Sequence, residues 1–273
     1  MSQERLMKES TRPQTRLSLT TDLKHLGLRE GMTVIVHSSM KSLGWVCGGA
    51  VAVIQALQEV ITHKGTLIMP AHSADVSDPR EWGNPAIPKE WIQEVMNEMP
   101  PFDPLITPTF GMGVISELFR TYPNVKRSHH PVHSFSVWGK NSEEVANNHS
   151  LDHGLGESSP LGYLYQNNGY VLMLGTGYET NTSMHLGEHM GGTVKQVKKM
   201  SPMLENHQRV WKEYVELDYD EETFSSIGER FESEYRILQG EVGNSQAKFI
   251  YQPDLVDFTG KHLKETTNHS KLT

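Results

Sequence analysis

Two residues spaced three apart, His185 and Glu188, form the pair in this sequence that is best suited to acid–base chemistry. Residues at this spacing share one face of a helix, so the carboxylate of Glu188 can orient the imidazole of His185. A histidine held in this way is suited to act as a general base. Spacing alone leaves a second interpretation open, in which the two residues form a solvated pair within a helix-capping cluster.

The segment around this pair predicts the elements that position it. The run YVLML (residues 170–174) is rich in strand formers and ends in a loop that contains glycine. Asn181, Thr182 and Ser183 are all residue types that favour a helix N-cap, and they open a short helix. We therefore expect His185 at the mouth of a strand–loop–helix unit, where α/β proteins bind their ligands.

Two further polar loops each precede a predicted helix, and the first of them also follows a predicted strand. The loop HSSMKSLG (residues 37–44) offers amides, hydroxyls and a lysine, which suit phosphate groups. It matches neither the GxxxxGK[ST] nor the GxGxxG nucleotide-binding pattern. The loop TPTFGMG (residues 107–113) places small polar residues before a helix. Each loop, taken alone, is also consistent with an ordinary turn or a capped helix.

A basic segment, KRSHHPVHSF (residues 126–135), holds three of the histidines. Runs of histidine can bind metals. His129, His130 and His133 share no regular face of a strand or helix, however. The segment therefore favours a loop that positions a phosphate or a carboxylate over a metal site.

His185-x-x-Glu188-His189 also matches the inverted zinc-peptidase motif, in which two histidines bind zinc and a glutamate acts as base. That motif needs a third ligand further along the chain, for which Glu205 and Glu213 are the candidates. The glycines in and after this segment predict a short and weak helix, which is a poor platform for such a site. A zinc-dependent hydrolase remains an alternative.

Strands alternate with helices along the chain, which predicts an α/β fold. We expect a single domain over residues 18–265, with a mixed, mostly parallel central sheet flanked by helices and an antiparallel C-terminal extension. Residues 1–17 are expected to form a flexible arm, 266–273 a flexible tail, and the proline-rich segment 71–108 a lid or insertion. The predicted helices are 18–26, 49–62, 88–99, 111–121, 142–148, 160–166, 221–235 and 254–263, and the predicted strands are 33–37, 66–70, 134–138, 170–174, 193–198, 209–217 and 247–251.

Composition limits the function classes. The chain has 273 residues and a formal net charge of −8, which argues against a nucleic-acid partner. Its apolar runs are interrupted by polar residues and its N-terminal segment is polar, so we expect neither a membrane span nor a signal peptide. A single cysteine, Cys47, excludes an internal disulfide and a cysteine-rich zinc site. Together these features predict a cytoplasmic protein.

Several motifs occur together and in one order, namely LGLREGMTVIVHSSMKSLGWVCGGA, TLIMP, TPTFGMGVISELFRTYP, KRSHHPVHSFSVWG, GLGESSPLGYLY and VLMLGTGYETNTSMHLGEH. This series resembles the aminoglycoside 3-N-acetyltransferase family, in particular its short, YokD-like branch, from about residue 20 to about residue 251. The resemblance implies an α/β fold distinct from that of the GNAT acetyltransferases. It also implies transfer of acetyl from acetyl-CoA to the 3-amino group of a 2-deoxystreptamine ring, the reaction of antibiotic-resistance enzymes.

The resemblance assigns roles to particular residues. It implies His185 and Glu188 as the catalytic pair and involves no metal. Coenzyme contacts are implied for His37, Ser38, Ser39, Met40, Lys41, Ser42, Leu43, Thr107, Thr109, Phe110, Gly111, Arg127 and Ser134. The acidic substrate contacts of the family are poorly matched here, and their candidates are Asp218, Asp220 and Glu222. The implied acceptor is a cationic small-molecule amine, and a homodimer is left open.

The implied reaction is direct transfer, in which His185 removes a proton from the attacking ammonium group. Donors to the tetrahedral oxyanion are expected at residues 38–40 or at Thr182. Cys47 lies among apolar and glycine residues and is not expected to carry an acyl group. Beside the zinc hydrolase, a non-catalytic acyl-CoA-binding protein on the same scaffold remains an alternative.

Overall fold

The computed structural model describes residues 3–10, 12–83 and 85–270. Its helices are α1 (Gln3–Glu9), α2 (Arg16–Leu26), α3 (Gly49–Ile61), α4 (Ile92–Glu98), α5 (Gly113–Arg120), α6 (Ser142–Asn147), α7 (Pro160–Gln166), α8 (Ser183–Gly191), α9 (Phe224–Glu234) and α10 (Gln252–Ser270), with short 3₁₀ turns η1 (Pro79–Glu81), η2 (Lys89–Trp91) and η3 (Tyr178–Thr180). Its strands are β1 (Thr33–Ser38), β2 (Thr66–Pro70), β3 (Lys126–Arg127), β4 (Phe135–Gly139), β5 (Tyr170–Leu174), β6 (Gln196–Glu205), β7 (Gln208–Leu217), β8 (Leu238–Val242) and β9 (Ser245–Tyr251).

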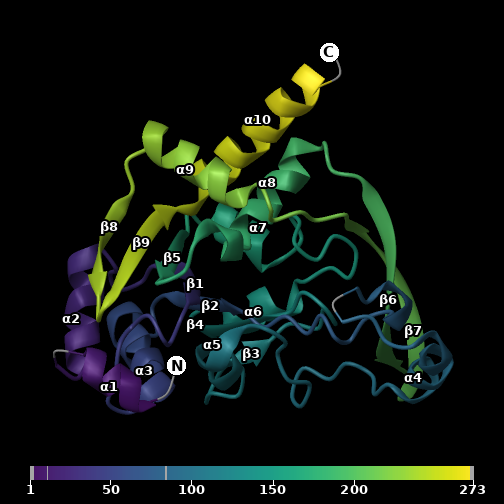
Figure 1. The fold of residues 1–273 in the computed structure, drawn as a ribbon, viewed down its shortest axis with the longest axis horizontal. Helices are drawn as coiled ribbons and strands as arrows, with labels where there is room; N and C mark the ends of the chain where they lie inside the picture. The colour runs from purple at the N-terminus through teal and green to yellow at the C-terminus, as the bar shows by residue number, and fades with distance from the viewer. Residues whose placement is uncertain (1–2, 11, 84, 271–273) are drawn as a thin grey trace.

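A seven-stranded sheet in the order β3-β4-β2-β1-β5-β9-β8 forms the centre of the molecule, and a separate ribbon of β6 and β7 lies to one side (Figure 1). The three central strands are parallel, with β1 paired to both β2 and β5. The remaining pairings are antiparallel. Because parallel strands end at the same edge of a sheet, the residues that follow β1, β2 and β5 converge there.

The central strands are apolar on both sides because helices cover both faces of the sheet. On one face Val34 and Val36 pack with the buried residues of α2, α3 and α5. On the other face Ile35 packs with residues of α7, α8, α9 and α10. Because α8 packs in the second of these two cores, its position relative to the carboxyl edge of the sheet is fixed. Helix α8 carries His185.

The predicted fold class is confirmed: the chain forms an α/β domain with a mixed sheet between helices and an antiparallel C-terminal extension, β9 and β8. Parallel pairing is confined to the three central strands. The bounds of β2, β5 and α7 agree with the predicted ranges. Helix α2 begins at Arg16 and not at the predicted Ser18, because Thr15 is the N-cap and forms a reciprocal capping box with Ser18.

The ends of the chain hold more structure than expected. Within the predicted arm, α1 is helical, and Gln14 is buried and pairs with Val46. Residues 1, 2 and 11 of that arm lie outside the described residues. At the other end α10 continues through Ser270, beyond the start of the predicted tail, and residues 271–273 are not described.

The proline-rich segment 71–108 braces the ribbon. Its helix α4 accepts hydrogen bonds at the Met96 carbonyl from the Arg209 guanidinium (2.9 Å) and the Trp211 indole (3.0 Å). The Phe102 amide donates to the Pro202 carbonyl at 2.8 Å. Figure 1 shows α4 beside the end of the ribbon. The segment therefore holds β6 and β7 in place, and its role as a lid stays a prediction.

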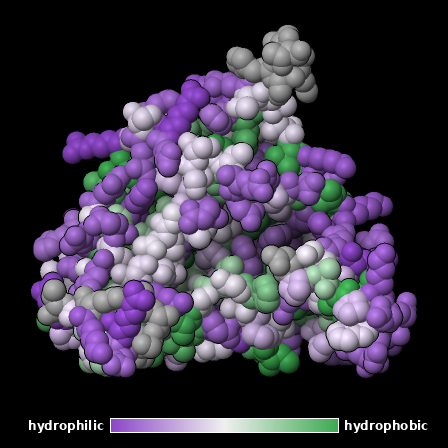
Figure 2. Space-filling view, viewed as in Figure 1, coloured by the Kyte–Doolittle hydropathy of each residue, from purple (hydrophilic) through white to green (hydrophobic). Residues whose placement is uncertain are grey.

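Figure 2 shows how polar and apolar residues are distributed on one face of the molecule. The face in Figure 2 is mostly hydrophilic, and apolar side chains form only small groups on it. Within the described part of the chain, no helix combines the length and the apolar character that crossing a bilayer requires.

Candidate active site

A cavity of about 400 Å³ lies at the carboxyl edge of the parallel strands. It is lined by the last residues of β1, by residues that end or follow β2, and by the chain between β5 and α8 together with the start of α8. The chain at the start of α5 and the chain after β7 also line it. Its lining residues are Val36, His37, Ser38, Pro70, His72, Gly111, Met112, Ser116, His133, Leu155, Thr176, Glu179, Thr180, Asn181, Thr182, His185, Tyr219 and Glu221.

The predicted His185–Glu188 contact is present. Nδ1 of His185 lies 2.5 Å from Oε2 of Glu188, and the Glu188 side chain is almost fully buried. The other carboxylate oxygen accepts the backbone N–H of Asp220 at 3.3 Å. Because a carboxylate only accepts, Nδ1 carries the proton and Nε2 keeps a lone pair. The rings of Tyr219 and Phe224 pack against His185, each with its centroid 4.8 Å away.

Helix α8 is anchored at its start and packed closely against α10. The N-cap is Thr182, whose side chain makes no capping hydrogen bond; the preceding Asn181 side chain instead accepts the Ser183 N–H at 3.2 Å. Gly187 faces Thr259 so closely that a Cβ on Gly187 would lie 2.6 Å from the Thr259 Cβ. The glycines in this segment predicted a weak helix. In the structure they allow α10 to approach closely, and the packing between the two helices compensates for the low helix propensity of glycine.

Five lining side chains present buried polar atoms that make no hydrogen bond within the described chain. They are His37 Nε2, Ser38 Oγ, His72 Nε2, His133 Nδ1 and Thr176 Oγ1. Burial, and then the neighbouring His185, lowers the pKa of both His37 and His72 to about 3. Burial also lowers the pKa of His133 well below its usual value. These imidazoles are therefore neutral at neutral pH and are available to bind polar ligand atoms.

The predicted coenzyme loop divides into two parts. His37 and Ser38 line the cavity. Ser39 and Ser42 bond to each other through their hydroxyls (2.9 Å), and Ser42 also donates to the Gly175 carbonyl, which fixes the turn against the end of β5.

The other residues of this loop differ in exposure. Lys41 is exposed, which suits a contact with a phosphate at the surface. Met40 is partly buried and packs on the core. Leu43 is fully buried within that core, so its side chain supports the loop from inside.

In the loop 107–111, only Gly111 lines the cavity. Phe110 is exposed, and its N–H donates to the His72 carbonyl at 2.8 Å. The Thr109 amide and hydroxyl both donate to Glu117, each at 2.8 Å. Thr107 accepts at its carbonyl from Arg127.

Arg127 and Ser134 are buried and make their contacts within the protein. The Arg127 guanidinium also donates to the Ala71 carbonyl (2.6 Å), to Ser73 Oγ (2.8 Å) and to Ser134 Oγ (3.0 Å). Burial lowers the pKa of Arg127 to about 10, so it stays charged at neutral pH. Its position supports the cavity wall by joining the ends of the segment 71–107.

The charged side chains that line the cavity are carboxylates, Glu179 and Glu221. Of the predicted substrate residues, Asp218 lines a second cavity of about 340 Å³, which shares His133 and Tyr219 with the first. Asp220 and Glu222 line neither cavity; the Asp220 carboxylate accepts the N–H of Glu222 at 2.9 Å.

The lining residues that were not among the predicted site residues include His72, His133 and Tyr219. His72 follows β2 by two positions, and its place after a buried strand is a signal that could have identified it. His133 lies in the basic segment that was noted, but its direction depends on the turn before β4. Tyr219 follows β7, whose placement is decided by tertiary packing.

The zinc-peptidase motif is not assembled. His185 is bonded to Glu188, whereas His189 is bonded through Nε2 to the Tyr219 hydroxyl at 2.8 Å. In the described residues, the group of three metal-ligating side chains that includes His189 does not include His185. The geometry therefore does not support the zinc-hydrolase alternative. Cys47 is exposed and does not line the cavity.

A model of the aminoglycoside 3-N-acetyltransferase family matches residues 35–264. The chain is 48% identical over 259 residues to the SPbeta prophage-derived aminoglycoside N(3')-acetyltransferase-like protein YokD of Bacillus subtilis (strain 168), covering 94% of this chain and 95% of that protein. The crystal structure of YokD superposes with a TM-score of 0.95 and 46% identity over 97% of this chain and 98% of its own.

Two solved enzymes with bound ligands share the fold. AAC-IIIb in binary complex with CoASH has a TM-score of 0.83 and 28% identity, covering 93% of this chain and 98% of its own. AAC-VIa bound to sisomicin has a TM-score of 0.85 and 26% identity, covering 93% of this chain and 99% of its own. The predicted family and its YokD-like branch are confirmed, and the chain belongs to the aminoglycoside 3-N-acetyltransferase family.

Proposed function

We propose that this chain transfers the acetyl group of acetyl-CoA directly to an amino group of an aminoglycoside or a similar polyamine, with His185 as general base. The observation that carries the proposal is the 2.5 Å contact between His185 and Glu188 beside the cavity. It leaves the Nε2 lone pair of His185 for the proton of an incoming ammonium group.

The step balances without a covalent enzyme intermediate. The acceptor ammonium loses one proton to His185, its nitrogen forms a bond to the acetyl carbon, and the carbon–sulfur bond breaks. The second proton that this nitrogen loses on becoming an amide passes to solvent. The proton then leaves His185 with the coenzyme thiolate, which restores the neutral imidazole. Alignment of amine and thioester in the cavity supplies the remaining acceleration.

The neutral lining groups are suited to the oxyanion of the tetrahedral intermediate. His37, His72 and Ser38 each present a polar atom that makes no hydrogen bond within the described chain. A neutral imidazole donates through the nitrogen that carries its proton, and a hydroxyl can also donate. In this proposal these side chains join the amides of Ser38 and Met40 and Thr182 as oxyanion donors. The Ser39 amide, by contrast, already donates to the Leu174 carbonyl at 2.9 Å.

Ligands bound to two relatives, and the carboxylates of this chain's cavities, support acetyl-CoA and a cationic amine as the two substrates. AAC-IIIb binds CoASH and AAC-VIa binds sisomicin. In this chain the loop 37–43, with exposed Lys41, and the loop 107–111 would hold the coenzyme. A cationic acceptor would be attracted by three carboxylates, Glu179 and Glu221 in the first cavity and Asp218 in the second. The expected nucleophile is the 3-amino group of 2-deoxystreptamine.

An acetylation screen tests this proposal. Purified protein is supplied with acetyl-CoA and a panel of aminoglycosides and other polyamines, and release of the free CoA thiol is measured. The proposal predicts acceptor-dependent release above the rate of thioester hydrolysis. Tight CoA binding with no acceptor-dependent release across the panel would instead support a non-catalytic acyl-CoA-binding protein.

A further inference from the structure

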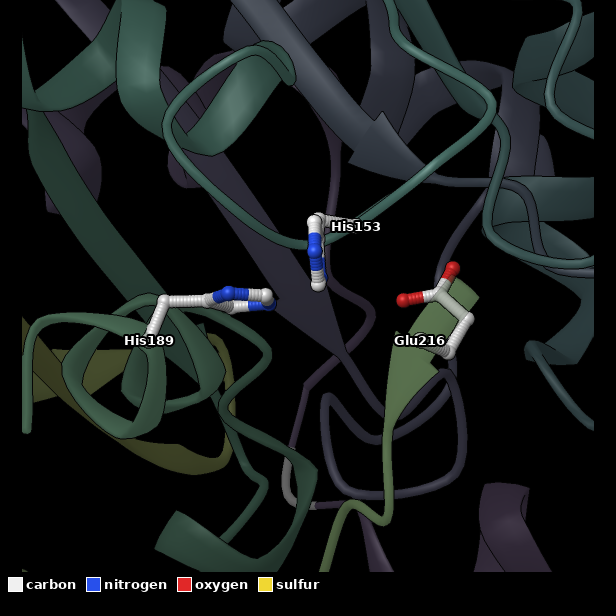
Figure 3. Close-up of side chains that lie close together, drawn as sticks. All are labelled: His153, His189 and Glu216. Carbon is white, nitrogen blue, oxygen red and sulfur yellow. The ribbon is translucent and has the colours of Figure 1, made fainter. Parts of the chain in front are cut away.

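A second group of ligating side chains lies outside the first cavity. His153 comes from the loop between α6 and α7, His189 from the last turn of α8, and Glu216 from the end of β7. Figure 3 shows the three side chains pointing toward one another. One ligand atom of each lies within 4.8 Å of the others. Three segments distant in sequence therefore meet at one point.

The carboxylate of Glu216 is buried without a strongly basic partner. Its residue is 2% exposed. In the described residues, its ion-pair contacts are the imidazoles of His130 (3.1 Å) and His133 (3.9 Å). The Gly154 N–H (3.0 Å) and the Tyr219 hydroxyl (2.8 Å) also donate to this carboxylate, and both donors are neutral. Buried carboxylates are normally paired with a cation or coordinate a metal.

The two histidines are suited to coordinate a metal. The buried Nδ1 of His153 makes no hydrogen bond within the described chain. The His189 ring lies edge-on to the His153 ring, with 5.2 Å between the centroids, and a neutral imidazole offers one ring nitrogen to a metal. The Tyr219 hydroxyl, 2.8 Å from both His189 Nε2 and Glu216 Oε2, holds these two side chains beside each other.

We propose that His153, His189 and Glu216 bind one zinc ion, with water in the fourth position. Two imidazoles and a carboxylate are a donor set that zinc prefers. Binding at about 2.0–2.2 Å from each ligand would draw the donor atoms together to roughly 3.3–3.6 Å. The ion would neutralise the Glu216 charge and join the loop, α8 and β7. It would thereby stabilise the elements that carry His185 and Tyr219, without taking part in acetyl transfer.

Zinc chloride titrated into chelator-treated, substrate-free protein tests this site by calorimetry and by the thermal midpoint. We expect one zinc per chain and a raised midpoint. His153→Asn suits the left-handed backbone there (φ 56°), and Glu216→Gln keeps the side-chain shape. Each should weaken binding at least about tenfold. The exposed-residue control His129→Ala and the catalytic variant His185→Gln should bind zinc like the wild type.

Three results would overturn the site: no zinc bound by the wild type, undiminished binding by both ligand variants, or loss of zinc in His185→Gln, which would place the metal in the helix motif. If both ligand variants fail to fold, wild-type crystals soaked in zinc chloride decide. An anomalous peak between the three side chains supports the site, and its absence contradicts it. Because no substrate is present, none of these results depends on acetyl transfer.

Discussion

Glu188 holds His185 by a 2.5 Å contact to Nδ1 while its second oxygen accepts the Asp220 amide. Glu188→Gln keeps the shape but allows its amide to donate to the ring, which favours the wrong tautomer of His185. We expect kcat to fall on the order of 10²-fold or more, with an unchanged KM for acetyl-CoA. Steady-state kinetics measure both, and an unchanged kcat would show that Glu188 does not set the tautomer.

Stability should fall as the pH is lowered below about 6.5. His37 has a folded pKa of about 3, so between pH 3 and its usual value the unfolded chain binds a proton that the folded chain does not. His37 alone should lower the free energy of unfolding by about 1.4 kcal/mol for each unit that the pH falls within that range. Urea unfolding at pH 7.5, 6 and 5 checks the slope. His37→Asn should reduce it, and the exposed-site control His129→Asn should not; equal slopes in all three proteins would refute the assignment.

Arg127 should act on the coenzyme through the loop 107–111. Arg127→Met leaves the buried Ala71 carbonyl and the partly buried Thr107 carbonyl with fewer donors, so the free energy of unfolding should fall by about 3 kcal/mol. The KM for acetyl-CoA should rise more than kcat falls, because the loop loses its anchor. Denaturant titration and kinetics test both effects. Lys126→Met, at the exposed neighbour on β3, is the control, and equal behaviour of the two variants would contradict the anchor.

Gly187 should be intolerant of a methyl group. In Gly187→Ala the new Cβ would lie 2.6 Å from the Thr259 Cβ, which forces α8 away from α10. The clash should outweigh the gain in helix propensity and lower the free energy of unfolding by about 1–3 kcal/mol. Gly83→Ala, where a Cβ meets nothing within 4 Å, should be near neutral. Thermal unfolding compares them, and a stabilised Gly187→Ala would show that the two helices are not tightly packed.

The sequence predicted best where one physical signal is strong. The apolar runs TLIMP and YVLML are bounded by turn residues and form β2 and β5 within their predicted limits. Strand β8 was not predicted, because LQGEV is largely exposed at the edge of the sheet and lacks an apolar alternation. The strand β6 was predicted too short for a similar reason: its polar residues give no periodicity over most of the ribbon.

The same contrast holds for the site. His185 and Glu188 are three residues apart on one helix, so their contact follows from local spacing. The contact of His189 with Tyr219, and the meeting of both with His153 and Glu216, joins segments far apart in the chain. No local pattern specifies such a meeting. For this reason the sequence led us to expect no metal site, whereas the geometry supports the one proposed here.

Acetyl transfer by His185→Gln, measured beside CoA binding by calorimetry, tests the central claim most directly. With the base removed, kcat should fall by about 10²–10⁴-fold while the Kd for CoA is unchanged. A variant that keeps wild-type kcat with an aminoglycoside acceptor would contradict the assignment of His185 as the general base.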